Sequence, residues 1–107
     1  MNEIDAPTQL ARRLTKLFPS FARELQDEEL DSFHQVVFLL APVVTEYLRN
    51  ASVETVEEFC KLINFMVACG GEKENAISTC LLEHASQIKI NRIIRPHLSS
   101  AAKRELR

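Results

Sequence analysis

The sequence predicts an all-α protein, a compact single-domain bundle of about five to seven helices with one helix kinked near Pro42. Apolar residues recur at the i, i+3, i+4 spacing of an amphipathic helix along most of the 107 residues. The alternation of apolar and polar residues that marks a strand is missing, and the only two glycines stand together as Gly70–Gly71. A chain of this length has room for one hydrophobic core, so a single domain over residues 1–107 is expected.

Prolines divide the first half of the chain into its expected helices. The first helix begins at Asp5 and Pro7 and ends before Pro19, with leucines along one stripe. A short helical turn follows over residues 21–26. Residues 28–50 then keep helical phase across Pro42, which has no N–H to donate and usually kinks a helix. One kinked helix, or two abutting helices, would satisfy this pattern.

Caps and glycines define the second half. Ser52 is a natural N-cap for a helix that Gly70–Gly71 would end. The second half of this helix, LINFMVAC, is apolar on all sides, which is typical of a helix covered by several neighbours, so we expect it at the centre of the bundle. A fifth helix is expected over residues 73–87. An irregular stretch or short helical turn should follow over 88–98, and Ser99 should cap a last, basic helix.

Charge is distributed unevenly along the chain. Residues 1–83 hold 7 Lys and Arg against 14 Asp and Glu, a net charge of −7, whereas residues 84–107 hold 6 against 1, a net charge of +5. An acidic body repels phosphate backbones and attracts basic proteins. The sequence therefore predicts a basic protein partner and disfavours nucleic acid, although the tail alone could contact it.

Three features of the sequence bear on the cellular compartment and on contact with a membrane. The start, MNEIDAPTQL, carries two acids and no apolar signal region. The longest apolar run, VVFLLAPVV, has nine residues, and crossing a bilayer takes about 20. Three cysteines, an odd number, do not form a disulfide framework. We therefore expect a cytoplasmic protein that does not contact a membrane.

Cys80 and His84 form the one pair that resembles a chemical site. Their i, i+4 spacing suits two metal ligands, but it suits two buried core residues equally well, and we expect both on a buried stripe. Structural zinc takes four ligands, and only Cys60 could add a third from the same side. The sequence also lacks a phosphate-binding glycine loop, a His-Glu-x-x-His metal motif and a nucleophile elbow. It therefore predicts a protein that is not an enzyme and that has no metal, cofactor or small-molecule substrate.

Two acidic faces are the candidate partner-binding sites. The first combines carboxylates with an aromatic ring on the face of residues 28–50 opposite the core. The second lies at the start of the helix capped by Ser52. The candidate residues are Asp27, Glu28, Asp31 and Phe38 on the first face, and Glu54, Glu57 and Glu58 on the second. Aromatic side chains among charges are enriched at protein interfaces, while a solvated face with a core-buried ring is the structural alternative.

Three segments carry a resemblance to a known family: FPSFARELQ (18–26), EKENAISTCLLEHA (72–85) and IIRPHLSSAAKREL (93–106). They are similar to small all-helical immunity proteins of bacterial contact-dependent growth inhibition systems, in particular those paired with an RNase A-like toxin domain. In this chain Leu81-Leu82-Glu83 stands where the family has Phe-Leu-Glu, and His97-Leu98-Ser99 stands where it has an aromatic residue and a glycine.

The resemblance implies a non-enzymatic inhibitor whose partner is a cognate toxin domain, a basic RNase. Its acidic surface would cover the active-site cleft of the toxin, with carboxylates in place of substrate phosphates. A helical adaptor that binds another protein, or nucleic acid through its basic tail, is the alternative. The tail residues concerned are Lys89, Arg92, Arg95, Lys103, Arg104 and Arg107. A thiol or metal enzyme centred on Cys80 and His84 is the third hypothesis.

Overall fold

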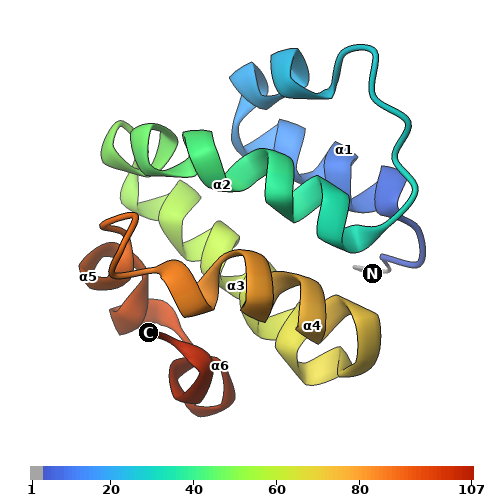
Figure 1. Cartoon of the computed structure of the whole chain (residues 1–107). Helices are drawn as coiled ribbons and strands as arrows, with labels where there is room; N and C mark the ends of the chain where they lie inside the picture. Colours follow the sequence, from blue (N-terminus) through green and yellow to red (C-terminus); the bar gives the residue numbers. More distant parts are fainter. Residues whose placement is uncertain (1–3) are drawn as a thin grey trace.

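The computed structural model describes residues 4–107, so the first three residues of the expected domain lie outside the described part (Figure 1). The architecture is all-α, as predicted. Its α-helices are α1 (Pro7–Leu17), α2 (Phe33–Arg49), α3 (Val53–Cys69), α4 (Gly71–Cys80), α5 (Asn91–Ile94) and α6 (Ser100–Glu105). Three short 3₁₀ helices join them: η1 (Pro19–Leu25), η2 (Leu82–His84) and η3 (Arg95–His97). Within residues 4–107, no helix is long and apolar enough to span a membrane.

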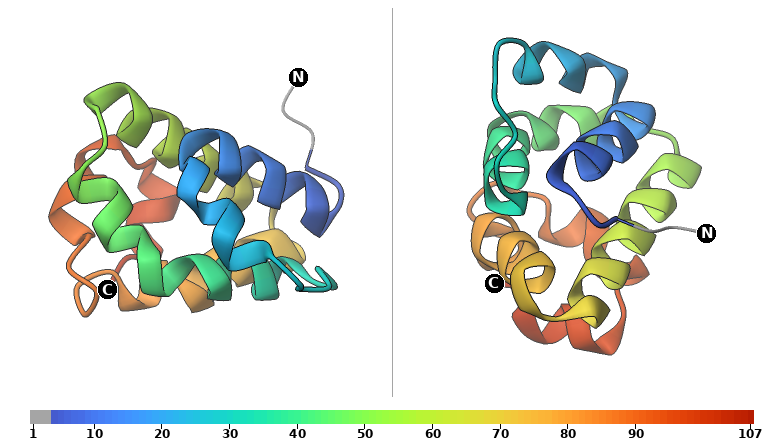
Figure 2. Two further views of the ribbon diagram at one scale, coloured as in Figure 1. Left: turned by 90° about the horizontal axis from the view of Figure 1, so that it is seen from above. Right: turned by 90° about the vertical axis from the view of Figure 1, so that its right-hand side faces the viewer.

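Helices α1, α2 and α4 begin at the same end of the bundle and run in the same general direction, while α3 returns between them (Figures 1 and 2). Helix α2 packs along α4, and α4 also packs against α3. The short elements α5, η3 and α6 pack against α3, and η2 packs against α4 and α6. The N-termini of α1, α2 and α4 are thereby brought together at one end of the bundle.

Helix α3 is the central element of the bundle, as its all-round apolar sequence predicts. It contacts α1, α4, α5, η3 and α6. The side chains of Phe59, Ile63 and Met66 are fully buried along it. At its end Gly70 adopts a φ of 68°, a left-handed conformation that glycine accepts without steric cost, and this confirms the predicted cap.

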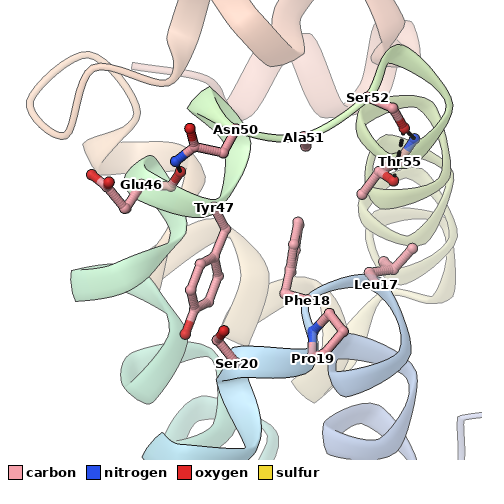
Figure 3. A pocket seen from close by; sticks show the side chains of 10 residues that line it. All are labelled: Leu17, Phe18, Pro19, Ser20, Glu46, Tyr47, Asn50, Ala51, Ser52 and Thr55. Carbon is pink, nitrogen blue, oxygen red and sulfur yellow. Dashed lines mark hydrogen bonds between the residues drawn. The ribbon is translucent and has the colours of Figure 1, made fainter.

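Phe18 joins the first three helices through its ring. It stacks on Tyr47 of α2 with ring centroids 5.3 Å apart, and its edge meets Phe59 of α3, also at 5.3 Å. Figure 3 shows Phe18 and Tyr47 side by side below the turn that carries Ala51. The hollow of about 450 Å³ above them is lined mainly by the ends of α1 and α2 and the start of α3. Burial and the nearby Glu24 carboxylate raise the pKa of Tyr47.

Helix α2 begins later than predicted, at Phe33 rather than Glu28. Ser32 caps it: its hydroxyl oxygen accepts a hydrogen bond from the Gln35 N–H at 3.1 Å. Gln35 reaches back to accept the Asp31 N–H at 2.9 Å, which completes a reciprocal cap and holds the preceding residues out of the helix. Helix α2 then continues through Pro42 as one element whose axis bends near its middle (Figure 2).

Helix α4 ends seven residues earlier than predicted, at Cys80 rather than residue 87. Leu81 leaves helical geometry, with φ −128° and ψ −62°. The break allows Leu81, Leu82 and Ala85 all to become fully buried. It also frees the Leu82 carbonyl to accept the Arg107 N–H at 2.9 Å. The burial of these three side chains therefore ends α4, although the helical spacing of apolar residues continues in the sequence to residue 87.

The C-terminal segment is tied back onto α3. The Asn64 side chain donates to the His97 carbonyl at 3.3 Å and accepts the Ser99 N–H at 2.9 Å. Ser99 in turn caps α6, because its hydroxyl oxygen accepts the Ala102 N–H at 3.2 Å. The predicted cap at Ser99 is confirmed, and so is the cap at Ser52, whose hydroxyl oxygen accepts the Thr55 N–H at 3.2 Å.

Replacing Phe59 by alanine should destabilise the protein by about 3–5 kcal/mol, because a fully buried ring is lost and a cavity is left. The matched change Phe38→Ala removes a ring that is 69% exposed and should cost within about 0.5 kcal/mol. Guanidinium unfolding monitored by circular dichroism measures both. Equal losses of stability would contradict this assignment of the core.

Cys60 should make stability fall in alkaline solution. Its thiol is fully buried near the Ile94 carbonyl, with Sγ and O 3.6 Å apart, and burial raises its pKa to about 12. In the unfolded chain the thiol ionises near about pH 8.5. Between that pH and 12 the unfolded state has released the proton and the folded state has not, so the unfolding free energy drops by up to about 1.4 kcal/mol per pH unit.

Unfolding of the native protein and of Cys60→Ala at pH 7, 9 and 10 measures this dependence, since other titrating groups are common to both. The variant should show the shallower loss of stability. Equal slopes in the two proteins would contradict the prediction.

Candidate functional site

Phe38 stands at the edge of an apolar groove between α2 and the segment that follows α4. Its side chain is 69% exposed, unusual for a phenylalanine in a domain of this kind. The groove has a volume of about 490 Å³. It is lined by Phe38, Ala41, Pro42, Thr79, Cys80, His84, Gln87 and Ile88. None of these is an Asp, Glu, Lys or Arg, so the groove has no formal charge when His84 is neutral.

Two contacts join α2 to the opposite wall of the groove. The Thr45 hydroxyl donates to the Ile88 carbonyl at 2.7 Å, and the Cys80 Sγ lies 3.8 Å from the His34 carbonyl oxygen. On the α2 wall, Pro42 has no N–H to donate to the Phe38 carbonyl one turn earlier. The exposed ring therefore lies beside a backbone carbonyl that lacks its usual partner within the helix.

An acidic hollow of about 440 Å³ lies where α1, α2 and α4 begin. It is lined by Asp5, Pro7, Asp31, Ser32, Phe33, His34, Glu72 and Asn75. Three carboxylates thus come from three separate segments. Each is near a helix N-terminus, where the partial positive charge of the backbone favours an anion.

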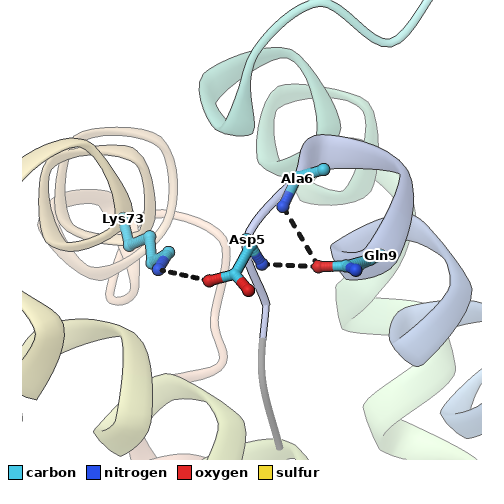
Figure 4. Close-up of polar contacts among 4 residues, drawn as sticks. All are labelled: Asp5, Ala6, Gln9 and Lys73. Carbon is cyan, nitrogen blue, oxygen red and sulfur yellow. Dashed lines mark hydrogen bonds and ion pairs between the residues drawn. The ribbon is translucent and has the colours of Figure 1, made fainter.

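Lys73 offsets part of this negative charge. Its Nζ lies 4.0 Å from an Asp5 carboxylate oxygen and 5.9 Å from the centre of the Phe33 ring. Figure 4 shows Lys73 reaching across from α4 to Asp5, whose backbone N–H is bonded to the Gln9 side chain. One lysine against three carboxylates leaves the hollow acidic.

The hollow and the groove follow one another along the seam between α2 and α4. On α2, His34 lines the hollow and Phe38 lines the groove one turn later. On α4, Asn75 lines the hollow and Thr79 lines the groove one turn later. The Thr79 hydroxyl donates to the Asn75 side-chain oxygen at 3.3 Å. We call the two together the α2–α4 face: an acidic end that continues into an uncharged, apolar groove.

The structure places the first predicted group only partly on this face. Asp31 lines the hollow and Phe38 lines the groove. Asp27 and Glu28 are exposed, but they lie on the non-helical segment before α2, where Asp27 has a left-handed φ of 64° and Glu28 accepts a hydrogen bond from Gln35 at 3.4 Å. The predicted helical face through these two residues is therefore wrong.

Sequence reasoning missed Asp5 and Glu72. Each lies at or near the start of a helix, and the sequence predicted both helices, but it did not show that the two starts would meet that of α2. The packing of α1 and of α4 against α2 brings these carboxylates to Asp31.

The second predicted group lies elsewhere. Glu54, Glu57 and Glu58 are exposed in the first two turns of α3, which starts beside the C-terminal end of α2, whereas Asp31 precedes its N-terminal end. A carboxylate oxygen of Glu58 lies 3.1 Å from the ammonium of Lys61. The acidic hollow therefore lies at the opposite end of α2, a helix about 25 Å long, from the start of the second predicted group.

Cys80 and His84 both line the groove, but not as a buried pair. His84 is exposed, with Nδ1 3.2 Å from the Gln87 side-chain oxygen, because α4 has ended four residues earlier. The expectation that it is buried is wrong. Cys80 is half-buried, and burial raises the pKa of its thiol, which disfavours the reactive thiolate. Across residues 4–107, no group of three or more His, Cys, Asp or Glu side chains is placed to hold a metal ion.

Comparison with curated proteins and with solved structures finds no match. A family model does match, over residues 11–107, which include the whole groove and all of the acidic hollow except Asp5 and Pro7. The family is described as "Domain of unknown function (DUF7674)", and this chain belongs to it.

Proposed function

We propose that this chain works by binding another protein through its α2–α4 face, with Phe38 as the anchor. The observation that carries the proposal is the exposure of Phe38, 69%, beside an apolar groove and next to an acidic hollow. An aromatic side chain in such a setting buries a large area when a partner covers it, and such residues often dominate binding energy.

The partner's expected chemistry follows from the two parts of the face. A basic side chain would enter the acidic hollow, and an apolar segment would cover Phe38 and fill the groove. Net charge supports this, because residues 1–83 carry −7 and would draw a basic protein from a distance. The carboxylates would mainly raise the association rate, and the groove would mainly slow dissociation.

We further propose that the partner is the toxin domain of a bacterial contact-dependent growth inhibition system, a basic RNase, which this chain neutralises. The resemblance of residues 18–26, 72–85 and 93–106 to immunity proteins of such systems supports this identity. Inhibition would occur by occlusion, with Asp5, Asp31 and Glu72 binding the cationic groups that otherwise hold RNA phosphates. Such an inhibitor needs no catalytic group of its own.

The proposal expects a toxin domain to be encoded beside this gene, and co-expression with that domain tests the identity of the partner. The two proteins should co-purify, and the purified chain should abolish RNA cleavage by the toxin at an equimolar ratio. Absence of binding to that domain would refute the immunity role, while leaving the α2–α4 face open to another basic protein.

Phe38→Ala should weaken binding by about 2 kcal/mol, roughly thirty-fold, because the anchor is lost. Val53→Ala is the matched control, since Val53 is the other large apolar residue exposed among residues 4–107, at 65%, and lies outside the face. Calorimetric titration of the toxin domain with each variant measures the effect. A comparable loss in Val53→Ala, or no loss in Phe38→Ala, would contradict the assignment.

Asp31→Asn should reduce the association rate several-fold at low salt and have little effect at high salt, because the carboxylate acts at long range. Glu57→Gln makes the same charge change on the second acidic group and should leave the rate nearly unchanged. Stopped-flow association at two ionic strengths distinguishes the groups. A slower association with Glu57→Gln and an unchanged rate with Asp31→Asn would place the interface at the start of α3 and contradict the prediction.

A further inference from the structure

A basic pocket lies on the segment between η2 and η3, outside the α2–α4 face. Its volume is about 500 Å³, and it is lined by Ser86, Lys89, Asn91, Arg92 and Arg95. Three of these five residues are cations, and none is an acid. None of the three forms an ion pair within the part of the chain that the structure describes. Figure 1 shows α5, which carries Arg92, at the end of the bundle where α2 finishes.

Hydrogen bonds fix one wall of this pocket before any ligand arrives. The Arg95 Nε donates to the Asn91 side-chain oxygen at 3.2 Å, and the Asn91 side-chain nitrogen donates to the Ser86 hydroxyl at 3.2 Å. Because Arg95 is held through Nε, its two terminal amino groups remain available to an anion. The Ser86 hydroxyl, which accepts from Asn91, can still donate its own hydrogen.

The backbone of the pocket is strained at Lys89. Lys89 has a left-handed φ of 66°, a conformation that is sterically unfavourable for a residue with a side chain. The turn is held by the Lys89 N–H, which donates to the Ser86 carbonyl at 3.1 Å, and by the Ile90 N–H, which donates to the Ala85 carbonyl at 2.9 Å. Glycine would fit this turn without strain. The presence of lysine instead suggests that its ammonium group has a function.

We propose that this pocket binds the phosphate group of a small phosphorylated molecule. Two guanidinium groups, an ammonium group and a hydroxyl are the donors that recognise phosphate oxygens. The pocket is open to solvent, and its volume of about 500 Å³ leaves room for a phosphate group and the small molecule that carries it. A long nucleic acid suits it less well, because residues 1–83 carry −7 and because Lys103 and Arg104 of the tail lie outside the pocket.

Titration of the ¹⁵N-labelled protein with inorganic phosphate, at constant ionic strength set by chloride, tests the proposal. Amide shifts should saturate and should be confined to Ser86, Lys89 and their neighbours through Arg95, with the side-chain Nε–H of Arg95 among the strongest. Shifts that rise linearly, or that chloride alone reproduces, would overturn it.

Arg95→Gln should weaken phosphate binding at least ten-fold, while Arg104→Gln, an equal loss of charge on α6, should leave the dissociation constant within two-fold. Lys89→Gly should also weaken binding but should not lower the melting temperature, because the strain at φ 66° disappears. Equal weakening in Arg104→Gln would show only general charge attraction and would refute the pocket.

A ten-nucleotide single-stranded RNA distinguishes the source of the phosphate. The proposal expects it to bind no more tightly than inorganic phosphate. Tighter RNA binding that is steeply salt-dependent and is lost in Arg104→Gln would assign the basic tail to nucleic acid and overturn the small-molecule reading.

Discussion

Burial of the broad apolar face of α3, which carries Phe59, Ile63 and Met66, is the constraint on which the rest of the structure depends. The second half of α3 is almost entirely apolar, so α1, α4 and the C-terminal elements must pack against it to remove that surface from water. Helix α1 is joined to it through the ring contact between Phe18 and Phe59, and the C-terminal segment through the paired bonds of Asn64. Gly70 then allows the chain to reverse into α4 directly. The α2–α4 face and the basic pocket both lie on elements that are arranged around α3.

The parallel course of α1, α2 and α4 separates the charges of the molecule. Because the three helices start together, carboxylates near their N-termini gather into one hollow, where each also benefits from the helix dipole. The basic residues of the last segment gather beyond the other end of α4. The chain thus places an acidic hollow at one end of the bundle and a basic pocket toward the other, although its net charge is only −2. The two proposed sites use these two ends independently.

Local rules are broken at positions that line or adjoin the proposed sites. Pro42 lies inside a helix and withholds a hydrogen bond from the Phe38 carbonyl. Lys89 and Asp27 adopt left-handed backbone conformations in which a side chain is strained. Pro42 lines the apolar groove, Lys89 lines the basic pocket, and Asp27 lies in the segment that leads to Asp31. Sequences are otherwise consistent with their fold at most positions, so such exceptions often mark functional surface.

The sequence by itself determined the all-α class, the caps at Ser52 and Ser99, the stop at Gly70 and the central place of α3, because periodicity and capping are local properties of the chain. It did not determine where α2 begins or α4 ends. The start of α2 is set by the cap that Ser32 and Gln35 form, which the helical apolar pattern running back to Glu28 concealed, and the end of α4 depends on the burial of Leu81 and Leu82 together. The exposure of Phe38, the meeting of Asp5 and Glu72 with Asp31, and the basic pocket were decided by the tertiary structure. Each requires residues distant in sequence to pack against one another, and a linear pattern carries no information on which helix ends will meet.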